Sequence, residues 1–134
     1  MPTAIFYLVL TAGLGIVLWI PHVVGMVMTN GMLKPGDYRD ITPKPVPPWV
    51  QRANRVVCNY AENIAPFAIL VIVAYIRYRQ AEPTKLAEIG LWAAVFFWAR
   101  VAHAVVYWLG IPYLRTIAFV VGVVATAVIF TMVM

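Results

Sequence analysis

The sequence predicts an all-α membrane protein, a four-transmembrane-helix bundle. Of its 134 residues, 63% are hydrophobic and 11% are charged, whereas a soluble domain carries about 25% charged residues. The apolar residues form four runs, each near the roughly 20 residues that a helix needs to cross a bilayer. Prolines and polar segments separate these runs. We therefore expect a single domain over residues 1–134, embedded in a lipid bilayer.

The first predicted span covers about residues 4–28. It is preceded by no basic residue and followed by no clear cleavage site, so we interpret it as a retained span and not as a secretory signal. Pro21 and His22 interrupt its second half. We expect a kink there, because proline removes a backbone hydrogen bond. His22 is then interfacial or faces the bundle.

The loop that follows covers about residues 29–51. It holds four prolines within six residues, namely Pro43, Pro45, Pro47 and Pro48. This spacing excludes a helix and favours extended, polyproline-like chain. A stiff loop of this length is either a plain connector or a cover over the mouth of a pocket.

The other three spans are predicted at about residues 52–76, 86–109 and 112–134. In the last of them, Ala118 and Gly122 form a small-xxx-small pair that we interpret as a helix-packing face. Four spans put both termini on one side of the membrane and the first and third loops on the other.

Basic residues favour one orientation of these spans. The first and third loops with their flanks hold Lys34, Arg39, Lys44, Arg52, Arg55 and Arg115. The second loop and its flanks hold Arg77, Arg79 and Lys85. By the positive-inside rule, the first and third loops lie in the cytoplasm and the termini lie away from it.

The composition also excludes some partners. The net charge is +5, but the basic residues form no dense run, and membrane topology and anionic headgroups account for them. We therefore expect no nucleic-acid partner. Cys58 is the only cysteine, which excludes an intramolecular disulfide and provides no metal cluster.

Two of the spans carry polar residues inside their apolar runs, at helical spacing. The two stripes are Arg55, Asn59 and Glu62 in the second span, and Arg100, His103 and Tyr107 in the third. A charged side chain inside a bilayer costs about 2.5–3.5 kcal/mol on insertion scales, so such groups need partners or a task. Measured from the end with the first loop, Glu62 lies about 8 Å, His103 about 9 Å and Arg100 about 14 Å deep. We expect one polar chamber there, open to the cytoplasm, which Arg115 enters from the same side.

This chamber holds more cations than anions. Arg55, Arg100 and Arg115 stand against one carboxylate, Glu62. That carboxylate pairs with Arg55 or Arg100, or else it holds a ligand amine. The planar guanidinium fork suits carboxylates and phosphates. A small ligand with carboxylates and an amine fits this set, and the apolar spans admit a lipid-soluble second substrate.

The complete pattern resembles that of the MAPEG family, the membrane-associated proteins of eicosanoid and glutathione metabolism. It reads Arg55-x3-Asn59-x2-Glu62, Arg100-x2-His103-x3-Tyr107 and Pro112-x2-Arg115-Thr116. The resemblance covers the length, the four spans, the long first loop and the polar positions. It implies a homotrimer that binds glutathione as co-substrate between subunits, on the cytoplasmic side. It further implies a bacterial-type member similar to microsomal glutathione transferases, in the bacterial inner membrane.

The resemblance also implies roles for single residues. Those that bind glutathione or support its binders are Arg55, Asn59, Glu62, Arg100, His103 and Tyr107. Arg115 matches an arginine thought to hold the glutathione thiolate, and Thr116 stands where some members have serine. An arginine at a helix N-terminus adds to the positive end of the helix dipole, and both favour a thiolate. Phe119 stands where some eicosanoid-forming members have tyrosine, and the first span lacks the arginines that some of them carry, which speaks against eicosanoid synthesis.

Three hypotheses of function follow. The leading one is a membrane-embedded, glutathione-dependent transferase or peroxidase that acts on lipophilic electrophiles or hydroperoxides. The alternative is a catalytically silent MAPEG-like binding or scaffold protein. A small proton-coupled drug transporter is disfavoured, because its glutamate would stand in the first span and its loops would be short. Cys58 is disfavoured as a nucleophile, because it points about 100° away from Asn59, and we interpret it as a buried structural cysteine.

Overall fold

The computed structural model describes residues 1–32, 34–38 and 42–134; Arg39, which contributes to the charge bias above, lies outside them. Its helices are α1 (Thr3–Leu18), α2 (Ile20–Asn30), the short 3-10 helix η1 (Pro35–Tyr38), α3 (Pro48–Tyr78), α4 (Pro83–Leu109) and α5 (Pro112–Val133). Four segments are long and apolar enough to cross a membrane: α1 with α2, α3, α4 and α5. The four predicted spans are thus confirmed, each within a few residues of its expected bounds.

The first span is broken where the sequence predicts a kink. α1 ends at Leu18 and α2 begins at Ile20, with Pro21 in the first turn of α2. The proline ring has no N–H to donate and clashes with the carbonyl of the residue four positions earlier, so the helix cannot continue unchanged. His22 faces the bundle, with Nδ1 3.4 Å from the carbonyl oxygen of Val50.

α2 approaches α3 closely at one glycine. A Cβ atom on Gly25 would lie 2.4 Å from Cγ2 of Val50 and 2.6 Å from the indole ring of Trp49. Only a residue without a side chain fits between the two helices here. This contact fixes the second half of the first span against the start of α3.

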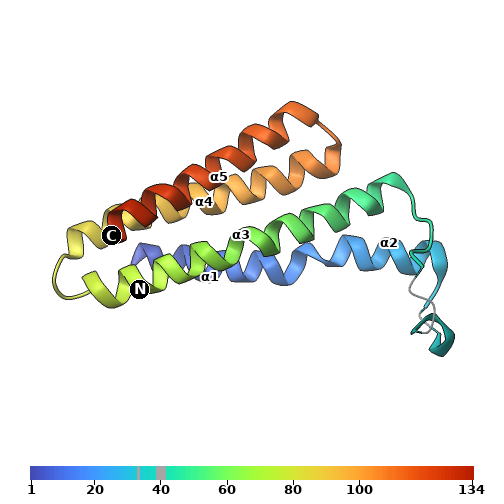
Figure 1. Cartoon of the computed structure of the whole chain (residues 1–134), viewed down its shortest axis with the longest axis horizontal. Coiled ribbons are helices and arrows are strands. Elements are labelled where there is room, and N and C mark those ends of the chain that lie inside the picture. Colours follow the sequence, from blue (N-terminus) through green and yellow to red (C-terminus); the bar gives the residue numbers. More distant parts are fainter. Residues whose placement is uncertain (33, 39–41) are drawn as a thin grey trace.

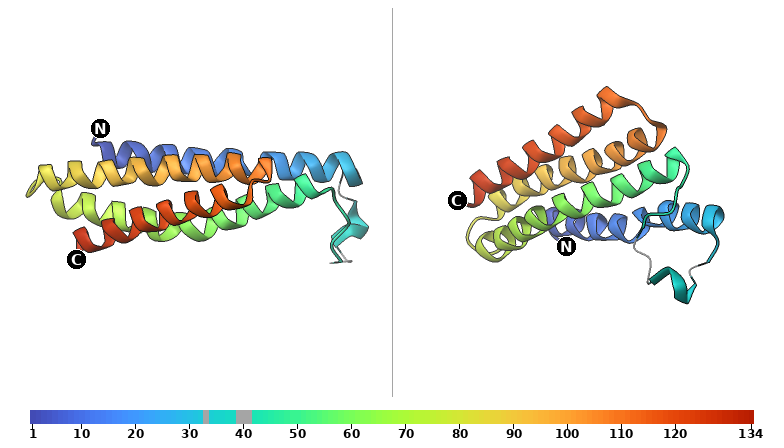
Figure 2. Two further views of the ribbon diagram at one scale, coloured as in Figure 1. Left: turned by 90° about the horizontal axis from the view of Figure 1, so that it is seen from above. Right: turned by 45° about the vertical axis from the view of Figure 1, so that its right-hand side comes forward.

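The ends of the helices meet as expected for four antiparallel spans. α1 lies beside α3, and α4 lies beside α5, with both termini at one end of the bundle (Figures 1 and 2). At that end the Tyr78 hydroxyl donates to the carbonyl oxygen of Met132 at 3.0 Å. At the other end Nε of Arg52 donates to the carbonyl oxygen of Trp108 at 3.2 Å. The first loop and the α4–α5 turn therefore share one end, as the sequence predicts.

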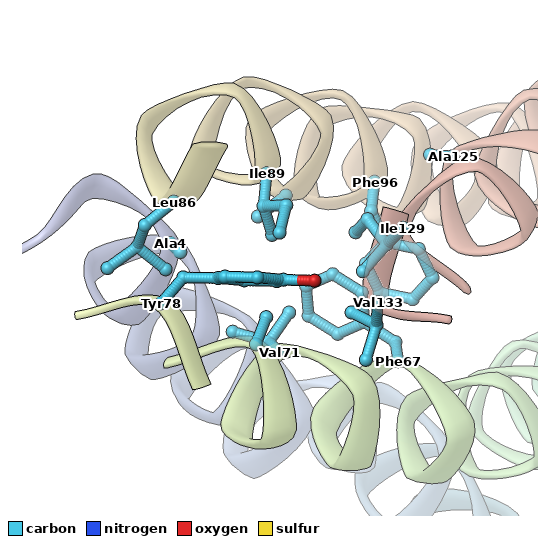
Figure 3. Packing of buried hydrophobic residues seen from close by; sticks show 12 residues of the cluster. Ala4, Phe67, Val71, Tyr78, Leu86, Ile89, Phe96, Ala125, Ile129 and Val133 are labelled. Carbon is cyan, nitrogen blue, oxygen red and sulfur yellow. The ribbon is translucent and has the colours of Figure 1, made fainter. Parts of the chain in front are cut away.

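The main apolar core lies toward the end with the termini. The rings of Phe67 and Phe96 stack there, with centroids 3.8 Å apart and an interplanar angle of 7°. Figure 3 shows the ring of Tyr78 between Ile89 of α4 and Val71 of α3. The polar residues of α3 and α4 that the sequence singles out lie beyond this core, toward the end with the first loop.

Candidate functional site

Arg100 of α4 is the centre of the polar region. Its side chain is 2% exposed. Nη1 donates to Oδ1 of Asn59 on α3 at 3.2 Å, and Nη2 donates to the carbonyl oxygen of Phe119 on α5 at 3.0 Å. One guanidinium therefore joins three helices. No carboxylate of the described residues forms an ion pair with it, and its buried Nε has no hydrogen-bond partner.

Gly122 of α5 provides the space for this guanidinium. A Cβ atom at residue 122 would lie 2.2 Å from Nη2 of Arg100 and 2.8 Å from its Cζ. We interpreted Gly122 from the sequence as part of a helix-packing face. The residue is buried, but its closest side-chain neighbour is a cation. The available signal was its position seven residues after Arg115, on the same face of the helix.

A column of rings connects Arg100 with Arg115. The Phe119 ring centroid lies 5.4 Å from Cζ of Arg100 and 6.2 Å from the ring of His103. His103 is buried and lies 5.4 Å from the ring of Tyr107. Cζ of Arg115 lies 5.0 Å from that Tyr107 ring. The structure thus brings together four residues that the sequence predicts for the site, and the ring faces attract both cations.

The accessible end of this column is the first turn of α5. Arg115 is half-buried there, and Thr116 beside it is exposed. The Thr116 hydroxyl donates to the carbonyl oxygen of Pro112 at 3.4 Å, within its own helix. The unpaired backbone N–H groups of this first turn add positive potential next to the Arg115 guanidinium.

Arg55 and Glu62 of α3 do not join the column within this chain. Both are exposed, and neither forms an ion pair within the part of the chain that the structure describes. At about 100° per residue, Asn59 is rotated by about 40° from Arg55 and about 60° from Glu62. That rotation lets Asn59 face Arg100 while the two charged residues stay on the outside of the bundle. The residues expected to line one chamber are therefore separated within one subunit: Asn59 contacts Arg100, whereas Arg55 and Glu62 lie on the outer face of α3.

Cys58 shares this outward face, and our interpretation of it as a buried cysteine is wrong. The thiol is free and exposed, with Sγ 3.9 Å from Oδ1 of Asn54. The residue is three positions after Arg55 and four before Glu62, so all three fall on one side of the helix. The apolar neighbours of Cys58 in the sequence did not reveal this orientation.

The first loop covers a cavity beside Arg55, which is one of the two interpretations that its prolines allow. The cavity has a volume of about 480 Å³ and is lined by His22, Met26, Pro43, Lys44, Pro45, Val46, Gln51, Asn54 and Arg55. Lys44 Nζ donates to Oδ1 of Asp37 at 2.6 Å, and the backbone N–H of Lys34 donates to Oδ2 at 2.7 Å. These hydrogen bonds, first that of Lys44, hold the pKa of the Asp37 carboxyl below its usual range. The loop is therefore tied back on itself over the cavity.

The fold and these contacts define an integral membrane protein of four spans, with a cation-rich polar column at one end of the bundle. A model of the MAPEG family matches residues 4–134, and the chain belongs to this family. Members of the family are four-helix membrane proteins that use glutathione in general. Among curated proteins, none is similar enough to the chain to count as a match.

Proposed function

We propose that the protein is a membrane-embedded, glutathione-dependent transferase or peroxidase that acts on lipophilic electrophiles or hydroperoxides. The observation that carries this proposal is the positive charge at both ends of the column of rings, at Arg100 and Arg115. Arg100 is buried with neutral oxygens as its acceptors, and Arg115 at the open end of the column has no carboxylate partner among the described residues. Buried cations without counter-ions favour an anionic guest. A thiolate is such a guest, and family membership supports glutathione as its source.

In this proposal the glutathione sulfur lies at Arg115, the accessible cation. An opposite charge within about 4–6 Å favours the ionised form of a thiol, and the thiolate is the nucleophile. Arg100 is closed off from solvent, so its role is to position Asn59 and the backbone at Phe119. Thr116 offers a second donor to the sulfur once its hydroxyl turns away from the Pro112 carbonyl.

Two reactions follow from a thiolate at this place. In the transferase reaction the sulfur attacks an electrophilic carbon, a C–S bond forms, and the leaving group departs with its electron pair. In the peroxidase reaction the sulfur attacks the peroxide oxygen and the O–O bond breaks, releasing an alcohol after protonation. The first sulfur is then a sulfenic acid; a second glutathione attacks it, the S–O bond breaks, and glutathione disulfide forms with release of water. The apolar faces of the spans give lipophilic substrates access from the bilayer.

The exposed pair on α3 supports assembly of several subunits. Arg55 and Glu62 carry charges within a membrane-crossing helix, where unpaired ions are costly. We propose that neighbouring subunits of a homotrimer, and the carboxylates and amine of glutathione, supply their partners. The bias of basic residues supports a cytoplasmic location of this end. A bacterial-type member similar to microsomal glutathione transferases, in the inner membrane, remains part of the proposal.

Isothermal titration of the purified protein with glutathione tests the binding step. We expect binding at millimolar concentration or below, and weaker binding by the variant Arg115→Ala. Lys85→Ala removes a cation at the opposite end of the bundle and serves as the control. The absence of binding heat at millimolar glutathione would overturn the proposal.

A catalytically silent binding protein is the second candidate. The observation that favours it is that Phe119, one turn after Arg115, carries no hydroxyl, and that the Thr116 hydroxyl donates to the carbonyl oxygen of Pro112. Turnover of an aryl halide or an alkyl hydroperoxide distinguishes the two candidates. Turnover that is lost in Arg115→Ala supports the enzyme, whereas binding of glutathione without turnover supports the silent protein.

A further inference from the structure

A second cavity, of about 540 Å³, lies at the opposite end of the bundle, where α1 and α4 begin and α3 ends. Arg79 is the only charged side chain among the described residues that line it. Its other polar side chains come from Thr3, Tyr75 and Gln80. Pro83 and Leu86 form part of an apolar wall. The cavity therefore combines hydrogen-bond donors with an apolar surface.

The walls of this cavity are held in place by close packing. A Cβ atom on Gly90 would lie 2.8 Å from Cβ of Thr3 and 3.0 Å from the backbone nitrogen of Ala4. The start of α1 is thereby fixed on α4. Tyr78, the residue before Arg79, does not line the cavity, but it is 2% exposed and its hydroxyl donates to the carbonyl oxygen of Met132 near the end of α5. These contacts fix the start of α1 and the end of α3, while the lining residues Arg79, Gln80 and Pro83 remain exposed, so the cavity is open to the surface.

Within the described part of the chain, Arg79 is the lining residue with a cationic side chain, and no ion pair holds that side chain. Its Cζ lies 5.6 Å from the ring centroid of Tyr75, which also lines the cavity. Arg77, its neighbour in the sequence, donates instead to the carbonyl oxygen of Val133 at 2.5 Å. Lys85 Nζ lies 4.5 Å from the Tyr78 ring, outside the lining.

The acidic residues at this end leave the positive charge in place. Glu82 and Glu88 are exposed, and within the described ranges neither forms an ion pair nor lines the cavity. Among the described residues at this end, the three basic side chains of Arg77, Arg79 and Lys85 therefore form no ion pair with the two glutamates. The region attracts anions, and Arg79 directs that attraction into the cavity.

We infer that this cavity binds a phosphate-containing anion, with the headgroup of an anionic phospholipid as its occupant. The guanidinium of Arg79 suits a phosphate oxygen pair. The position favours a lipid, because the cavity lies where the membrane-crossing helices end, at headgroup depth, with tyrosine and arginine beside it. The apolar wall accommodates the first carbons of the acyl chains. This site is separate from Arg115, since α3 alone has 31 residues and spans about 46 Å.

Native mass spectrometry of the purified full chain tests the inference, with phosphatidylglycerol and phosphatidylcholine of identical acyl chains. We expect phosphatidylglycerol to bind and Arg79→Gln to weaken that binding by about fivefold, since a basic residue near the surface contributes about 1 kcal/mol. Lys85→Gln removes the same charge at the same end without touching the cavity. We expect Lys85→Gln to bind phosphatidylglycerol as the wild type does. Circular dichroism of both variants checks that they are folded.

The same experiment distinguishes the possible occupants. Equal losses in Arg79→Gln and Lys85→Gln would overturn the inference, because the effect would then come from general charge and not from the cavity. The inference would also be overturned if the wild-type protein bound phosphatidylcholine as tightly as phosphatidylglycerol. Inorganic phosphate is added alone in a third arm. If it binds in an Arg79-dependent manner while phosphatidylglycerol does not, the lipid is excluded as the occupant.

Discussion

The guanidinium of Arg100 occupies the space in which a side chain of residue 122 would lie, since a Cβ atom there would be 2.2 Å from Nη2. The two residues belong to the neighbouring helices α4 and α5. This fit places the guanidinium within reach of Asn59 on α3 and of the Phe119 carbonyl, one helical turn from Arg115. The position of Arg100 in the polar column therefore depends on residue 122 having no side chain.

Gly122→Ala is expected to destabilise the protein by about 1–3 kcal/mol, the usual cost of an overpacked core. The added methyl group displaces Arg100 and breaks its hydrogen bond to Phe119. Thermal unfolding in detergent, followed by circular dichroism, measures the effect. Gly13→Ala is the matched control, because a Cβ atom at Gly13 meets nothing within 4 Å. An unchanged midpoint in Gly122→Ala would contradict the tight fit.

A double-mutant cycle is expected to show coupling between Asn59 and Arg100. Asn59→Ala removes the acceptor of Nη1, and Arg100→Met removes the donor, so the second change matters less once the first is made. Contacting residues show coupling of about 0.5–3 kcal/mol in unfolding free energy. Gln51→Ala is the control. It also truncates an amide side chain of α3, but that amide donates to the carbonyl oxygen of Val46 and not to Arg100. Its effect on the unfolding free energy should therefore add to that of Arg100→Met. If the effects of Asn59→Ala and Arg100→Met on the unfolding free energy simply added, this hydrogen bond would contribute nothing to stability.

The spans and their order follow from the sequence, because bilayer thickness fixes their length and proline fixes their breaks. The break beside Pro21 and the pairing of helix ends were predictable for this reason. The hydrogen bond between Asn59 and Arg100 did not follow from the expected depths, because residue counting placed Arg100 about 14 Å deep and Asn59 only a few ångströms deep. The two residues meet because α3 begins at Pro48, several residues before its expected start, so Asn59 lies deeper than predicted.

The rotation of each helix could not be predicted. Lipid is as apolar as a core of Leu and Val, so apolar residues do not reveal which side of a membrane helix faces its neighbours. Small differences in angle then decide the outcome: Asn59 turns inward, whereas Arg55, Cys58 and Glu62 turn outward. The role of Gly122 was hidden for the same reason, because small residues serve helix packing and cation packing alike.

The first loop is expected to loosen in acid. The pKa of Asp37 lies below its usual value of 3.8, because Lys44 and the Lys34 backbone bond its carboxylate. A lowered pKa in the folded protein means that these bonds are complete above pH 3.8 and are lost as the pH falls through the lower value. A titration of the Asp37 carboxyl carbon by nuclear magnetic resonance should give a midpoint below 3.8.

The variant Lys44→Gln tests the main cause of this shift. It removes the first of the hydrogen bonds to Asp37 while the Lys34 backbone bond remains. We expect the midpoint to move up toward the usual value without reaching it. A wild-type midpoint at 3.8 or above, or no movement in Lys44→Gln, would show that the loop is not tied in this way.

Arg115→Ala is expected to shift the pH dependence of turnover in the alkaline direction. Under the proposed function, the guanidinium lowers the pKa of the glutathione thiol, and an adjacent opposite charge shifts a pKa by about 1–3 units. Without it, the thiolate forms only at higher pH, so kcat/KM near neutral pH falls by about tenfold or more, while activity at high pH recovers in part. Arg115→Lys retains the charge and should shift the profile less. A merely structural role of Arg115 would lower turnover equally at all pH values, so parallel profiles for Arg115→Ala and the wild type would exclude thiolate stabilisation by this residue.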